Sequence, residues 1–137
     1  MTTINATKGE FVNLINGLFA VQEMKGKEFG LIVSKNITAI RKELKEVEEA
    51  GAPSPEFLKL AEQVNILANK DSEESKDKIT QLEENNKELV DARRLEVEKV
   101  KKMLQEDISI DLELISTNTL PEDVTAKQIN GIEIIIE

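Results

Sequence analysis

The stretch from Pro55 to Glu106 most constrains what this chain can fold into. After its first residue, roughly fifty residues pass without a Gly or a Pro. Ser54 stands at a favoured N-cap position, Pro55 at the first helical position and Glu56 in the first turn. The sequence therefore predicts one helix over about residues 55–106. Such a helix would be about 75 Å long at a rise of 1.5 Å per residue.

The apolar pattern along this predicted helix changes twice. A broad apolar face comes first, and no apolar residue occurs from Asn69 to Lys78. The helix either crosses solvent there or breaks in two, and the favourable Glu74 to Lys78 spacing, without Gly or Pro, favours a continuous or kinked helix. A narrow stripe then resumes, made of Leu82, Leu89, Val97, Val100 and Leu104. It is typical of a helix that packs against one neighbour, either a preceding helix of this chain or a binding partner.

Two shorter helices are predicted before it, over about residues 8–24 and 28–50. The first begins at a capping box in which the Thr7 hydroxyl accepts from the Glu10 amide and the Glu10 side chain accepts from the Thr7 amide. Gly17 interrupts its apolar face at a cost of about 1 kcal/mol relative to Ala. The second helix ends at the Gly51-Ala52-Pro53 sequence, where glycine and proline favour a stop.

After Glu106 the period of the apolar residues changes from 3.6 to 2, which indicates strand structure. Apolar and polar residues alternate over about 108–115, as in a half-buried strand. An isoleucine-rich run predicts a second strand over about 132–136, after a short helical turn that begins near Thr125. A β-branched run predicts an edge strand over about 2–6. We expect these strands to pair and to place one face on the helices.

Together these elements predict a mainly α fold with a small β element, of the α+β class. The main part would be a long antiparallel helical hairpin or coiled coil, and the ends of the chain would form a short terminal β-sheet. A length of 137 residues predicts a single domain over 1–137. Aromatic residues are 3% of the chain and all lie in its first half, so the second half must pack with aliphatic residues.

The composition argues against several classes of function. A net charge of −9 argues against direct nucleic-acid binding, which needs clustered Lys and Arg. The chain has no Cys and no His, so thiolate metal sites and the commonest neutral-pH general base are missing. No phosphate-binding motif occurs, and no apolar run reaches the roughly 18 residues of a membrane span. We therefore expect no enzymatic activity, no catalytic residue, no cofactor, no metal site and no membrane contact.

The last 31 residues carry most of the negative charge. They hold seven acids and one lysine, which contribute −6 of the −9. Asp107, Asp111 and Glu113 have the chemistry of a divalent-cation site, but their alternation along a strand favours a solvated face. Four acids of this region are instead candidates for binding a basic protein: Asp111, Glu113, Glu122 and Asp123.

Three segments of the chain carry a family resemblance. They are TKGEFVNLINGL near the start, EMKGKEFGLIVSKNI in the middle, and EDISIDLELI with LPEDVTAKQINGIEIII at the end. In these segments the chain resembles a group of small uncharacterised proteins encoded by tailed bacteriophages. The resemblance implies a phage origin, with a location in the host cytoplasm or the virion. It implies no catalytic residue and no activity.

Two functions follow from these observations as hypotheses. The first is a non-enzymatic protein that acts through protein–protein contact and self-assembles, with the stripe from Leu82 to Leu104 as its binding surface. The alternative is an acidic inhibitor that mimics nucleic acid and presents its C-terminal acids to a basic host or defence protein. Such binding would weaken steeply with salt, because it depends on charge.

Overall fold

The computed structural model describes all residues from Met1 to Glu137. The chain is mostly helical with one small antiparallel sheet, which confirms the predicted α+β class. It forms two compact units: unit 1 comprises Met1–Val47 and Lys102–Glu137, and unit 2 comprises Glu48–Lys101. The prediction of a single domain over 1–137 stays a prediction, since compact units of one chain can belong to one folding domain.

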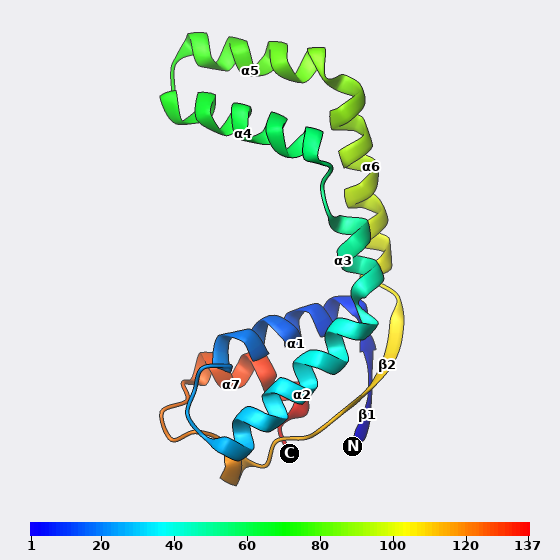
Figure 1. Cartoon of the computed structure of the whole chain (residues 1–137), viewed down its shortest axis with the longest axis vertical. Coiled ribbons are helices and arrows are strands. Elements are labelled where there is room, and N and C mark those ends of the chain that lie inside the picture. The colour runs from blue at the N-terminus through cyan, green and yellow to red at the C-terminus, as the bar shows by residue number, and fades with distance from the viewer. The chain divides into compact units, whose positions relative to one another are not determined.

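Unit 1 contains both ends of the chain and both strands (Figure 1). Its elements are β1 (Thr2–Thr7), α1 (Lys8–Val21), α2 (Lys27–Glu43), the start of α3 (Lys45–Gly51), β2 (Asp107–Leu112), the short 3-10 helix η1 (Thr117–Thr119), α7 (Ala126–Ile132) and a second 3-10 helix, η2 (Glu133–Ile135). The predicted helix over 28–50 is therefore two helices. They separate at Leu44, whose φ of −96° and ψ of 8° leave helical geometry.

Strands β1 and β2 pair antiparallel, with Thr2 opposite Leu112. The N-terminal strand predicted from the sequence is therefore confirmed. One face of the sheet is apolar, and Ala6, Ile110 and Leu112 are buried there. The polar residues that alternate with them occupy the other face, as in other small sheets with one solvated side.

Strand β2 ends at Leu112, before the predicted limit at residue 115, because a side chain takes over the pairing. The Asn36 amide of α2 donates from Nδ2 to the Glu113 carbonyl oxygen at 2.9 Å. The Glu113 backbone N–H donates to Oδ1 of Asn36, also at 2.9 Å. Asn36 is completely buried, so this pair of hydrogen bonds anchors the end of β2 to α2 inside the core.

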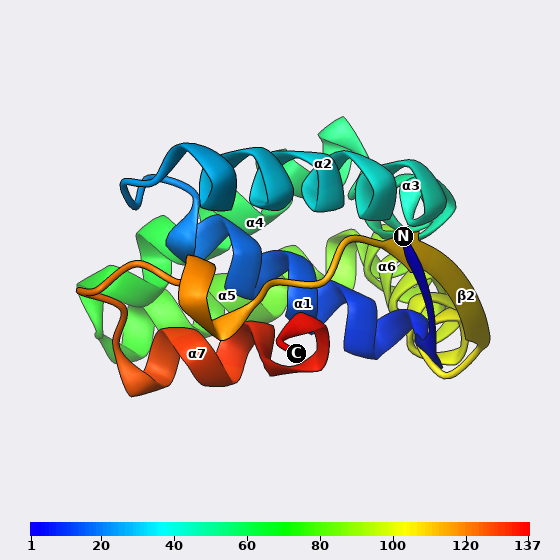
Figure 2. The same cartoon turned by 90° about the horizontal axis from the view of Figure 1, so that it is seen from below.

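Helix α1 lies between α2 and α7 in unit 1 (Figure 2). The largest fully buried apolar side chains of this core are Phe11, Leu18, Phe29, Ile40, Leu112, Ile115, Ile132 and Ile135. Helices α1 and α7 approach most closely at two glycines, where a Cβ added to Gly17 would lie 2.2 Å from the Gly131 carbonyl oxygen. Gly17 is therefore needed for packing, which its sequence context did not indicate.

Helix α7 begins at a complete capping box. The Thr125 hydroxyl accepts from the Gln128 N–H at 3.2 Å, and the Gln128 side chain accepts from the Thr125 N–H at 2.9 Å. Glycine often marks the end of a helix, but Gly131 does not end α7. Instead the helix continues to Ile132, because Gly131 supplies the close contact with α1 and not a C-terminal stop.

The predicted strand over 132–136 is wrong. After α7 the chain forms η2, and only an isolated parallel bridge joins Ile115 to Ile136. The β-branched composition favoured a strand, but strand propensity depends strongly on what surrounds the segment. Here Ile132 and Ile135 are both completely buried, and their three-residue spacing turns them to the same side of a helical turn.

Unit 2 consists of helices joined by short connections (Figure 1). It contains the end of α3, then α4 (Pro55–Lys70), α5 (Glu73–Asn85) and α6 (Lys87–Met103) as far as Lys101. Helices α4 and α5 run side by side as an antiparallel pair. The predicted single helix over 55–106 is therefore wrong, and with a longest helix of 17 residues a long hairpin or coiled coil is not confirmed.

Two local features break the predicted helix. Asp71 adopts a left-handed conformation, with φ 43° and ψ 50°, and Ser72 then caps α5 by accepting from the Ser75 N–H at 3.1 Å. Asn86 separates α5 from α6, and its side chain donates to the Leu82 carbonyl oxygen at 2.8 Å. Asp tolerates the left-handed conformation better than most non-glycine residues, so the chain reverses at Asp71 without Gly or Pro.

Candidate functional site

An apolar groove of about 650 Å³ lies on unit 2. Helix α4 contributes one wall, made of Phe57, Leu60, Ala61, Val64, Asn65 and Ala68. Glu62 of α4, Glu83 of α5 and Val90 of α6 complete the lining. The groove is therefore mostly hydrophobic and carries few polar groups, as binding surfaces for apolar partners do.

Helix α4 forms this wall because its apolar residues cover more than one face. Leu60 points into the unit and is only 5% exposed. Leu58 and Ile66, on another side of the helix, are 53% and 54% exposed. A single neighbouring helix covers only one stripe of a helix surface, so α5 leaves part of the apolar surface of α4 in solvent.

Arg93 of α6 fixes the start of α4 at one end of the groove. Its Nη1 donates to the Gly51 carbonyl oxygen at 2.9 Å and pairs with the Glu96 carboxylate at 3.1 Å. Its guanidinium also lies over the Phe57 ring, 5.7 Å from the ring centroid. These three contacts hold the connection between α3 and α4 against α6, and they place Phe57 in the lining.

Replacing Arg93 with Ala is expected to lower the free energy of unfolding by about 1–2 kcal/mol, because a charge-assisted hydrogen bond and a ring contact are lost together. The matched control is Arg94→Ala, since Arg94 is 69% exposed and lies 3.9 Å from Asp91. That change should cost at most about 0.5 kcal/mol. Urea unfolding followed by far-ultraviolet circular dichroism measures both. Equal losses in the two variants would contradict the role of Arg93.

The residues of the predicted binding stripe lie on two helices and in the segment that follows α6, and their role in binding stays a prediction. Leu82 belongs to α5, whereas Leu89, Val97 and Val100 belong to α6 beyond the break at Asn86. Leu104 follows α6 in unit 1, where its carbonyl oxygen accepts from the Gly9 N–H at 2.9 Å. Of the five residues only Val97 is classed as exposed, at 37%.

The four predicted acidic residues all lie in unit 1, outside the groove. The Asp111 carboxylate accepts from the Thr3 hydroxyl at 2.5 Å, and the Glu113 carboxylate lies 3.7 Å from the Lys35 ammonium. Glu122 and Asp123 are exposed in the segment between η1 and α7. Two of the four therefore already interact within the unit, and their binding to a basic protein stays a prediction.

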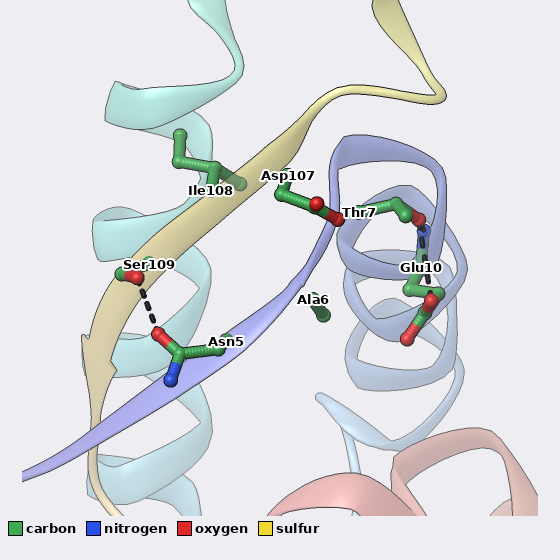
Figure 3. Close-up of a pocket in the computed structure, with 7 residues that line it drawn as sticks. All are labelled: Asn5, Ala6, Thr7, Glu10, Asp107, Ile108 and Ser109. Atoms are coloured by element: carbon green, nitrogen blue, oxygen red, sulfur yellow. Dashed lines mark hydrogen bonds between the residues drawn. The ribbon is translucent and has the colours of Figure 1, made fainter.

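A second pocket, of about 600 Å³, lies at the sheet and the start of α1 (Figure 3). Its polar side chains bond to one another: Asn5 with Ser109 across the strands, and Thr7 with Glu10 at the helix cap. The Glu10 side chain meets the Thr7 hydroxyl and not the Thr7 amide, so only half of the predicted capping box forms. No group of three or more acidic, His or Cys residues in the chain could hold a metal ion.

The sequence predicts the groove residues as part of a broad apolar helix face, but not as a binding surface. Two signals in the sequence indicate that part of this face stays exposed. The face is wider than one neighbour can cover, and the polar run after it contains the turn that brings α5 back along α4. Neither signal identifies which apolar residues stay exposed, because that depends on the position of α5.

No protein-family model, curated protein or solved structure matches this chain. The groove is therefore interpreted from its own residues. No helix of the chain combines the length and the apolar character that crossing a membrane requires.

Proposed function

We propose that this chain is a non-enzymatic protein that acts by binding another protein through the groove of unit 2. The main support for this proposal is the unequal distribution of buried hydrophobic residues between the two units. Eighteen hydrophobic residues of the chain are buried, and among them only Leu60 belongs to unit 2. A helical unit with so little buried apolar surface gains little stability from its own packing, and a partner that covers the groove would supply what is missing.

The exposed residues support the same function. Leu58, Ile66, Leu95 and Val97 are all at least 37% exposed in unit 2. Single exposed apolar residues are common on proteins, but here they accompany an apolar groove on the same small unit. Recognition of a helix in a hydrophobic groove is a frequent mode of protein–protein binding.

A phage origin, with action in the host cytoplasm or the virion, is part of this proposal and rests on the sequence resemblance. Self-assembly into a homo-oligomer is a related form of it, in which the groove partner is a second copy. Light scattering measures this directly, because a monomer has a mass of 15.4 kDa.

Site-specific photocrosslinking tests the groove as a binding surface. A photoreactive phenylalanine at Ala61, in the groove, is expected to give one discrete protein adduct in phage-infected cells. The matched position is Ala92, which is exposed on α6 and does not line the groove. A second change, Ala68→Arg, places a long charged side chain in the groove and should reduce the adduct at least about fivefold. Equal adducts from both positions, or none from Ala61, would contradict the proposal.

A further inference from the structure

The charged side chains that line the groove are all negative. Glu62 and Glu83 are its only charged lining residues, and both are acidic. Unit 2 as a whole holds fourteen acids and nine bases, a formal charge of −5. An apolar surface bordered by carboxylates favours a partner whose apolar residues are flanked by positive charges.

Arg93 does not neutralise the negative charge of the groove. It contacts Phe57 at one end of the groove, but its guanidinium already donates to Gly51 and pairs with Glu96 at 3.1 Å. A cation engaged by a carboxylate adds little to the field that an approaching partner meets. The charge that the groove presents to a partner is therefore negative, and it comes from the lining residues Glu62 and Glu83.

The apolar wall has the length and spacing of a helix-binding surface. Its residues Phe57, Ala61, Val64 and Ala68 follow one another by four, three and four positions. The eleven steps from Phe57 to Ala68, at a rise of 1.5 Å each, span about 17 Å, or about three helical turns. Ala61 and Ala68 are small and exposed, so the backbone of a second helix can approach closely at those two positions.

A second copy of the chain fits this surface poorly. Glu62 lines the groove near the middle of its apolar wall, which runs from Phe57 to Ala68 on α4. Antiparallel pairing of two α4 helices about that midpoint would place the two Glu62 carboxylates against each other near the symmetry axis. Each copy also carries a net charge of −9, which adds to the repulsion.

We propose that the groove binds a basic amphipathic helix of another protein, about three turns long, with apolar residues on one face and Lys or Arg on both sides of that face. This inference rests on the proposed function, and it specifies the chemistry of the partner. Apolar residues of the partner helix would cover Phe57, Val64 and Val90, while its basic residues would lie against Glu62 and Glu83.

Peptide binding to the full chain tests this inference. The probes are two fluorescein-labelled amphipathic helices of roughly 16 residues that share one apolar face, the first flanked by lysines and the second by glutamates. Fluorescence anisotropy should show at least about tenfold tighter binding of the lysine peptide at low salt, with a smaller difference at about 300 mM salt. The double variant Glu62→Lys with Glu83→Lys should lose or reverse that preference.

The matched control is Asp77→Lys with Glu98→Lys, which makes the same change in net charge at exposed positions of α5 and α6 outside the groove lining. It should change the preference less than about threefold. Equal binding of the two peptides, binding of neither, or a salt-resistant dimer of the free chain would overturn the inference. If one of these results is found while an adduct still forms at Ala61 in cells, the partner is not a basic helix. The proposed function, protein binding through the groove, would still hold.

Discussion

Gly17→Ala is expected to lower the free energy of unfolding by about 2–3 kcal/mol. The added Cβ would lie 2.2 Å from the Gly131 carbonyl oxygen and 2.6 Å from its carbon, and backbone atoms cannot move aside as a flexible side chain can. Helices α1 and α7 would have to separate, which opens the core on both sides of the contact. This cost exceeds the roughly 1 kcal/mol that Ala gains over Gly in a helix.

The chain offers a matched control for this change at Gly30, inside α2, where an added Cβ meets no atom within 4 Å. Gly30→Ala should therefore raise stability by about 0.5–1 kcal/mol. Gly131→Ala should fall between the two, since its Cβ would lie 3.2 Å from the Gly17 Cα. Urea unfolding monitored by far-ultraviolet circular dichroism measures all three. Stabilisation by Gly17→Ala similar to that by Gly30→Ala would show that α1 and α7 do not approach as described.

The sequence predicts best those elements whose signals are local. The start of α1 at Thr7, the start of α4 at Ser54 and the strand β1 all form as predicted, and Ser54 accepts from the Phe57 N–H at 3.1 Å. Each depends on residues within one turn or one strand. Capping and alternation act over such short distances, so no knowledge of the tertiary packing is needed.

The two main failures have different causes. The left-handed conformation of Asp71 reverses the chain where no Gly or Pro marks a turn. The isoleucine run before Ile136 has strong strand propensity, yet it forms a helical turn in which Ile132 and Ile135 are completely buried. At Asp71 the break comes from a left-handed residue and the Ser72 cap, whereas in the isoleucine run tertiary contacts decide between local alternatives of similar energy.

The candidate site was predictable only in part, because the exposure of its apolar face depends on tertiary packing. The apolar face from Phe57 to Ala68 is visible in the sequence, and so is the surplus of acids. The sequence could not show that α5 covers only one side of that face. It also assigned the binding surface to the stripe from Leu82 to Leu104, because a continuous helix would have placed those residues on one line.

Asn36→Leu is expected to lower the free energy of unfolding by about 3–5 kcal/mol, the largest effect among these single substitutions. Leucine has nearly the same shape but cannot replace either hydrogen bond, so the partly buried Glu113 N–H and carbonyl oxygen would both lose their partner. Each unsatisfied buried group costs about 1–3 kcal/mol. Sequence reasoning placed Asn36 on a helix without a role, since its partner lies 77 positions away in the chain.

Lys35→Ala provides the matched control, because it removes the other α2 side chain that contacts Glu113. The Lys35 ammonium lies 3.7 Å from the Glu113 carboxylate and its side chain is 60% exposed, so this change should cost at most about 0.5 kcal/mol. Asn36→Asp keeps the acceptor for the Glu113 N–H but turns a carboxylate oxygen toward the Glu113 carbonyl, so it should remain strongly destabilised. Urea unfolding compares the three, and losses for Asn36→Leu no larger than for Lys35→Ala would show that the buried amide does not anchor β2 to α2.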